Sequence, residues 1–297
     1  MNPASAPELL GPERRLHVER LARHFDWRAT GRSPLPGRHR GPRLGTSGEF
    51  EGYRPYEPGD DLARLDLRVL ARLGQRVVRL EREDSALPLT VLIDRSSSMT
   101  GAVRARAVAE LAYFFLVLAA DGHDPTRLFT FGAGRLTLHE RRRAGCVDAR
   151  ALLRALHDTP LSGASHFEGE FARLGPDAAG PGLVIIISDG LGLVEPARAI
   201  APLRRAGRVL WLAPLEPDER SPRPAGDVRL EPREPGNAWR GRLDAPTVLD
   251  YRRQLERYLG AVRSAVLELG GDFVALRAEE PIGDMIAEIQ RHGRVYR

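Results

Sequence analysis

The stretch that most constrains the fold is residues 89–101, which read LTVLIDRSSSMTG. The apolar and β-branched run 89–93 is long enough for a buried strand and too short for a helix. Polar residues follow at 94–98, and Thr100 and Gly101 lead into a helical pattern. The order strand, oxygen-rich loop, helix is typical of open α/β sheets, which hold their ligands at the carboxyl ends of their strands.

Three side chains of this loop carry oxygen donors at alternate positions: Asp94, Ser96 and Ser98. One carboxylate with several hydroxyls suits a hard cation such as Mg²⁺, which keeps bound waters and accepts few charged ligands. The alternative is an Asx or Ser turn that only caps the following helix. An Asp-x-Ser-x-Ser sequence after a hydrophobic strand resembles the metal-ion-dependent adhesion site (MIDAS) of von Willebrand factor A domains.

Two further loops correspond to the other metal loops of that resembled site. Ser165, after Gly163 in LSGASH, stands where von Willebrand A domains carry a threonine, and Asp189 follows the apolar strand 183–187. The resemblance implies that this aspartate reaches the ion through water. We therefore expect all five side chains around one Mg²⁺, or alternatively Mn²⁺ or Ca²⁺. The sequence leaves open whether the ion binds before a partner carboxylate completes its coordination. The five residues are Asp94, Ser96, Ser98, Ser165 and Asp189.

Residues 49–84 contain a second distinctive pattern. Pro58-Gly59-Asp60-Asp61 predicts a turn with aspartate at a helix start, where the helix dipole favours negative charge. A short, mostly buried helix is expected after it, and 77–82 reads as a strand. Taken by itself, the segment predicts a small scaffold beside the main sheet.

Together these patterns resemble the bacterial family called domain of unknown function 58, whose members carry a von Willebrand A-like domain. Leu67 departs from the family, which usually has tryptophan after the aspartate. The family's typical association with MoxR-type AAA+ ATPases implies such a partner here. The matching residues are Glu49, Phe50, Arg54, Tyr56, Pro58, Gly59, Asp60, Asp61, Asp66, Ala71, Arg72, Asp94, Ser96, Ser98 and Met99.

The rest of the chain alternates helical and strand patterns, which predicts a doubly wound, mainly parallel α/β sheet of the Rossmann type. We expect a von Willebrand A-like domain at 87–297, with a Pro- and Arg-rich excursion at about 216–246. Residues 1–86 are expected to form an N-terminal region, partly loop, packed on this domain. The expected helices are 13–25, 102–120, 148–157, 167–174, 195–206, 247–269 and 282–291, and the expected strands are 127–132, 135–139, 183–187, 208–213 and 272–276.

Composition limits the function classes. The single cysteine, Cys146, rules out an internal disulfide. All 45 basic residues are arginine and 40 acidic residues oppose them, so the net charge of +5 reflects compositional bias more than phosphate binding. A nucleic-acid binder using Arg38, Arg40, Arg43 and 141–143 is a minor alternative. We find no secretory pattern and no apolar run of membrane-spanning length, and therefore expect a cytoplasmic protein.

The function expected from these patterns is a metal-dependent protein-interaction module. A client or partner would supply an Asp or Glu to the ion, and the chain would act as adaptor of a MoxR-type AAA+ ATPase in a chaperone-like or complex-maturation process. The ATPase itself lies elsewhere, because the chain has no lysine with which to build a P-loop. A Mg²⁺-dependent hydrolase is the alternative. Haloacid-dehalogenase chemistry, however, requires a second aspartate where Ser96 stands and a lysine, so we expect no enzyme.

Overall fold

The computed structural model describes residues 10–25, 49–61, 65–82, 88–121, 124–142, 148–174, 182–205 and 207–292. Two compact units are present, one comprising 1–32 with 87–297 and the other comprising 33–86. Helix α2 (Pro12–Arg23) therefore lies in the unit of the main sheet, whereas the sequence analysis grouped it with the segment up to residue 86. The predicted arginine-rich loop 38–43 lies outside the described residues.

The main unit is built on a six-stranded sheet in the order β10-β7-β6-β3-β4-β5. All neighbouring strands run parallel except β5, which returns antiparallel to β4 as the edge strand. The predicted doubly wound, mainly parallel α/β fold is thereby confirmed. The strands are β3 (Leu89–Asp94), β4 (Thr126–Gly132), β5 (Arg135–Arg142), β6 (Leu183–Ile187), β7 (Arg208–Leu215) and β10 (Asp272–Arg277).

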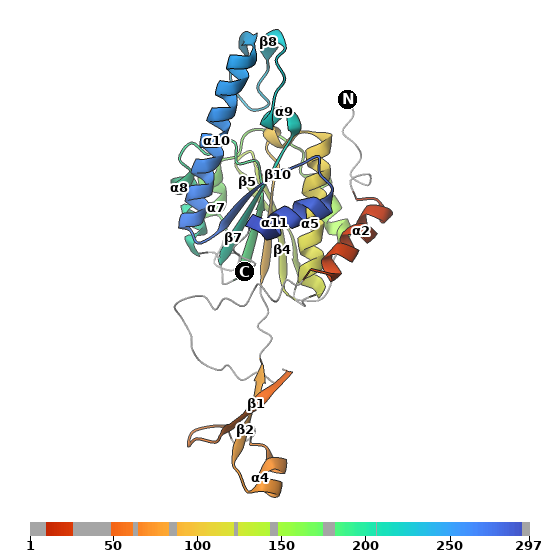
Figure 1. Cartoon of the computed structure of the whole chain (residues 1–297), viewed down its shortest axis with the longest axis vertical. Helices are drawn as coiled ribbons and strands as arrows, with labels where there is room; N and C mark the ends of the chain where they lie inside the picture. Colours follow the sequence, from red (N-terminus) through yellow and green to blue (C-terminus); the bar gives the residue numbers. More distant parts are fainter. Residues whose placement is uncertain are drawn as a thin grey trace. The chain divides into compact units, whose positions relative to one another are not determined.

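Both faces of the sheet are covered by helices, because the central strands are apolar on both sides (Figure 1). Alternate residues of β3 enter different cores, Val91 and Ile93 on one face and Leu92 on the other. The first face is covered by α2, α5 (Ala102–Asp121), α6 (Ala149–Asp158) and α11 (Ile282–His292). The second is covered by α7 (Phe167–Ala172), α8 (Pro196–Ala199), the 3₁₀ segment η3 (Ala201–Arg205) and α10 (Ala245–Glu268).

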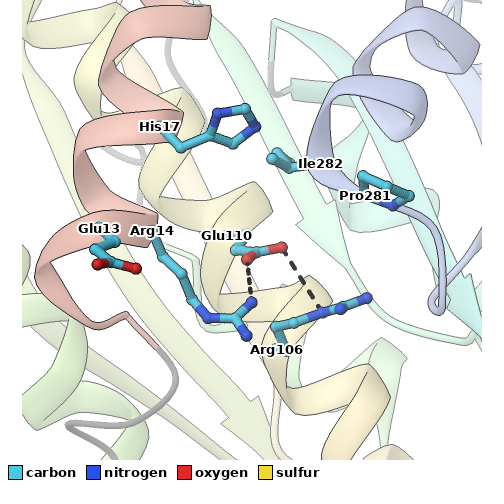
Figure 2. A pocket seen from close by; sticks show the side chains of 7 residues that line it. All are labelled: Glu13, Arg14, His17, Arg106, Glu110, Pro281 and Ile282. Atoms are coloured by element: carbon cyan, nitrogen blue, oxygen red, sulfur yellow. Dashed lines mark hydrogen bonds and ion pairs between the residues drawn. The ribbon is translucent and has the colours of Figure 1, made fainter.

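Helix α2, in which Val18 is buried, is fixed to α5 by polar contacts, one of which is drawn in Figure 2. Arg14 donates to Glu110 at 2.9 Å, and the Tyr113 hydroxyl donates to Glu19 at 2.7 Å. A pocket of about 300 Å³ lies at this junction, lined by Glu13, Arg14, His17, Arg106, Glu110, Pro281 and Ile282.

Two expected elements differ from the structure. The helix expected at 195–206 is split into α8 and η3, because Pro202 lacks the N–H that a continuous helix would need. The excursion 216–246 is more ordered than expected. It contains the short helix α9 (Pro217–Arg220) and an antiparallel pair, β8 (Gly226–Leu230) and β9 (Trp239–Leu243).

The second unit pairs β1 (Glu49–Pro55) with β2 (Val77–Arg82) antiparallel and carries α4 (Leu67–Leu73). The helix expected to begin at Asp60 or Asp61 would run through 62–64, which lie outside the described residues. Asp66 caps α4 by accepting from two backbone N–H groups, while Asp60 pairs with Arg54 through two bonds of 2.6 Å. In its described part, α4, the helix expected to be mostly buried is exposed, since Leu67 and Leu73 are each 68% exposed.

The family motif therefore acts within the second unit as a stabiliser of a turn. The Arg54 side chain holds the pKa of Asp60 down to about 2, mainly through their hydrogen bonds. Asp60 also accepts from the Glu57 N–H at 2.9 Å, and the Tyr56 N–H donates to the backbone of Arg76. These contacts give the arginine, tyrosine and first aspartate of the motif a structural role.

None of the helices in the described part of the chain combines the length and apolar character that a bilayer crossing requires.

The backbones just before β6 and β3 lie so close together at Gly182 and Pro88 that they give a prediction about stability. A Cβ on Gly182 would stand 2.2 Å from the carbonyl oxygen of Pro88, whereas one on Gly260, inside α10, would meet nothing within 4 Å. We expect Gly182→Ala to lower the unfolding free energy by about 1–3 kcal/mol through overpacking. The control Gly260→Ala should raise it by up to about 1 kcal/mol through helix propensity. Denaturant titration of both variants measures this; equal effects would contradict the strand packing.

Candidate functional site

Asp94 ends β3 and is the point at which three chain segments meet. Its Oδ1 accepts from the Ser96 backbone N–H at 2.8 Å and from the Ser165 hydroxyl at 2.9 Å. Its Oδ2 accepts from the Ser188 hydroxyl at 2.6 Å. Asp94 is 1% exposed, so these donors replace the water that a carboxylate normally binds.

The first loop places its two serine hydroxyls side by side. Ser96 is fully buried, and its hydroxyl lies 2.9 Å from the hydroxyl of Ser98. Ser98 belongs to the short 3₁₀ turn η2 (Ser97–Met99). Gly132, at the end of β4, allows the loop to lie this close. Its φ is 134°, and a Cβ there would stand 2.9 Å from the Ser96 nitrogen.

The second loop is joined to the first through backbone hydrogen bonds. The Ser97 N–H donates to the Gly163 carbonyl at 2.8 Å, and the Ser162 N–H donates to the Arg95 carbonyl at 3.0 Å. Ser165 is thereby held beside Asp94, 5% exposed. The structure brings four of the predicted residues together: Asp94, Ser96, Ser98 and Ser165.

The fifth predicted residue, Asp189, follows β6 and faces the same centre. Burial raises the pKa of Asp189, while Arg104 and, to a smaller extent, the nearby Ser98 hydroxyl lower it. The negative charge of Asp189 contributes to the raised pKa of Asp94. Asp189 is also held by a residue that the sequence analysis did not single out. The guanidinium of Arg104, fully buried in the first turns of α5, donates to Asp189 Oδ2 at 3.0 Å and to the Ser98 carbonyl at 2.5 Å.

Burial has the largest effect on the pKa values of the two carboxylates at this centre, Asp94 and Asp189. Burial first, and then the charge of Asp189, raises the pKa of Asp94 to about 7. Burial also raises the pKa of Asp189, although Arg104 opposes this effect. Arg104 pairs with Asp189 but is shared with Glu219, so the two buried carboxylates are not fully neutralised, and a divalent cation would relieve the remaining repulsion.

The donor set fits a hard divalent cation. Asp94, Ser96, Ser98, Ser165 and Asp189 offer only oxygen, which is the donor that Mg²⁺, Mn²⁺ and Ca²⁺ prefer. Within the described residues no group of three or more His, Cys, Asp or Glu side chains is arranged to hold a metal. An ion at this centre would therefore depend on serine hydroxyls and retained water, as Mg²⁺ accepts.

Sequence reasoning missed three participants. Ser188 directly precedes Asp189, and its position after an apolar strand was a usable signal. Arg104 was also detectable, as a charged residue near the start of a helix that is otherwise largely apolar. Glu234, which lies beside Ser98, carried no signal because it lies 136 positions away in an irregular excursion, where Arg233 also reaches the Ser98 carbonyl.

The fold and the centre define a class: an α/β domain with an oxygen-lined site at the carboxyl ends of adjacent parallel strands. The family model described as "Protein of unknown function DUF58" matches residues 52–257, which is well over half of the chain. The protein belongs to this family, as the sequence motifs predicted.

Individual relatives share about a quarter of their aligned residues with this protein. An uncharacterized protein of Mycobacterium tuberculosis, Rv1480, is 27% identical over 266 residues, covering 86% of this chain and 82% of the relative. The uncharacterized protein Mb1516 of Mycobacterium bovis has the same identity and coverage.

Two solved structures are similar over about two thirds of the chain. The conserved hypothetical protein BatB from Bacteroides thetaiotaomicron has a TM-score of 0.41 at 16% identity, covering 69% of this chain and 98% of that one. The SpRpn10 VWA domain has a TM-score of 0.39 at 14% identity, covering 68% and 94%.

The raised pKa of Asp94 gives a pH prediction for the metal-free protein. Because its folded pKa of about 7 exceeds the ordinary value of 3.8, protonation favours the folded state. That stability is fully present below about pH 4 and is lost as the pH rises through about 7. Asp94→Asn removes this titration. We expect its melting temperature relative to wild type to rise between pH 4 and 8 in the presence of EDTA. A pH-independent difference would contradict the burial of a charged Asp94.

Proposed function

We propose that this protein is a protein-interaction module that recognises a carboxylate of its partner through a divalent cation. Asp94, Ser96, Ser98 and Ser165 would hold the ion, with Asp189 reaching it directly or through water. When bound, the ion supplies an electrophilic centre with coordination left open for an Asp or Glu of the partner.

The observation that carries this proposal is the convergence of hydroxyls and buried carboxylates from three loops. The hydroxyls of Ser96 and Ser165 each lie within 2.9 Å of a partner in this cluster, and they are buried by loops that bond to one another. Neutral hydroxyl donors leave more positive charge on a cation than carboxylates would, and this favours capture of an external carboxylate.

The arrangement favours binding over hydrolysis. Both oxygens of Asp94 already accept hydrogen bonds from the chain, at 2.6 to 2.9 Å. A carboxylate held in this way is well placed to fix three loops. It is poorly placed to attack a substrate, because an attacking oxygen must be free to approach the reacting atom.

The partner we propose is a MoxR-type AAA+ ATPase, or a client protein shared with one. Support comes from the family resemblance and from the absence of any P-loop sequence in this chain. In this role the protein would act as an adaptor in a chaperone-like or complex-maturation process, and it would hydrolyse no ATP by itself.

The proposal predicts that Asp94→Ala loses cation and partner binding together. Isothermal titration with Mn²⁺, and pull-down of a purified MoxR-type ATPase in Mg²⁺ and in EDTA, measure the two properties. The control Asp250→Ala removes an exposed carboxylate of α10 that pairs with Arg253 at 3.4 Å, and it should behave as wild type. Equal Mn²⁺ heats from Asp94→Ala and wild type would contradict the metal site. ATPase capture that persists unchanged in EDTA would contradict metal-dependent recognition.

A further inference from the structure

The segment between β8 and β9 reaches the first loop of the candidate centre. Arg233 donates to the Ser98 carbonyl at 3.3 Å and also to the Thr100 carbonyl. It lies 4.0 Å from Glu219 of α9, which itself pairs with Arg104. Arg233 thus connects residues 231–238 to residues 98–100 of the first loop. It also approaches Glu219, whose partner Arg104 pairs with Asp189.

Glu234, the next residue of this segment, places a carboxylate against the centre. Burial raises the pKa of Glu234, and the charge of Asp189 adds to this rise, while the nearby side chain and backbone of Ser98 oppose it. Although Glu234 is only half-buried, its Oε1 atom is buried and has no hydrogen-bond partner.

A capping role does not account for this geometry. A glutamate that served only to cap the 3₁₀ turn at 97–99 would need one oxygen on the Ser98 backbone, and its other oxygen would remain in water. Here Oε1 is removed from water without a hydrogen-bond donor, which costs free energy unless something else binds it. A cation held by Asp94, Ser96 and Ser98 would supply that missing partner.

We propose that Glu234 is the carboxylate that completes the cation centre from within the chain, so that the β8–β9 segment covers the site until a partner carboxylate displaces it. This inference rests on the proposed function, because it requires the cation. It adds Glu234 as a second direct carboxylate beside Asp94, with Asp189 acting through water, so no cluster of three direct acidic ligands is needed. Partner binding then becomes a competition between two carboxylates for one coordination position.

The competition gives the covering segment a definite role. A partner that offers Asp or Glu must break the contacts of Arg233 and Glu234 with residues 98–100 and expose the first loop. Replacing Glu234 with a neutral residue removes the internal competitor. Such a variant should bind the bare ion less tightly and an external carboxylate more tightly.

Mn²⁺ alone is the probe for the test, and electron paramagnetic resonance of free Mn²⁺ is the readout on the full chain. We expect Glu234→Gln to weaken Mn²⁺ binding at least about tenfold, as loss of a ligand or its supporting contact does. The control Glu231→Gln, in the same segment but exposed and paired with Arg229 at 2.6 Å, should match wild type. Hydrogen exchange of residues 231–238 should slow on Mn²⁺ addition in wild type and not in Glu234→Gln.

The outcomes separate this inference from the proposed function. Equal Mn²⁺ affinity in wild type and Glu234→Gln, with binding lost in Asp94→Ala, would overturn the role of Glu234 and leave the metal site standing. Absence of Mn²⁺ binding in wild type would overturn both. Circular dichroism of Glu234→Gln establishes that the variant is folded, and Glu234→Asp, which keeps a carboxylate on a shorter stem, should retain part of the affinity.

Discussion

The arrangement of the candidate site depends on one buried carboxylate, that of Asp94. It accepts hydrogen bonds from its own loop, from the loop before α7 and from the end of β6, which are segments separated by 71 and 94 positions. Hydrogen bonds to a charged group contribute about 1.5–3 kcal/mol each, and leaving a buried donor unpaired costs a similar amount. The positions of Ser96, Ser165 and Ser188 therefore follow from the position of Asp94.

The sheet explains why this carboxylate can be buried at all. β3 lies at the centre of the strand order with β6 and β4 parallel on either side, so the ends of the three strands meet at one edge. The loops then cover the end of β3, and Gly132 permits the close approach of β4 to Ser96. Arg104 pairs with Asp189 and so limits the repulsion between Asp94 and Asp189.

Much of the fold could be predicted from sequence because apolar runs such as 183–187 and helical patterns such as 102–120 are local signals. The five predicted site residues were also detectable, since each follows a buried strand or precedes a helix. What could not be predicted depends on contacts distant in sequence. Arg104 stands out as a charged residue in an apolar helix, but its pairing with Asp189 across 85 positions has no local signal. The same holds for the contact of Arg233 with Ser98 across 135 positions. The pairing of Asp60 with Arg54 was also not predicted, although the two residues are close in sequence.

The central claim is that one divalent cation is held by the three loops around Asp94. Anomalous diffraction from crystals grown with Mn²⁺ tests it most directly. The account predicts a single anomalous peak bounded by Asp94, Ser96 and Ser98, with oxygen donors at about 2.1–2.2 Å. Its shell should include Ser165, Asp189 or their bound waters, and Glu234. A crystal that shows no peak at this position, or in which Arg104 fills the space between Asp94 and Asp189 at saturating Mn²⁺, would contradict it.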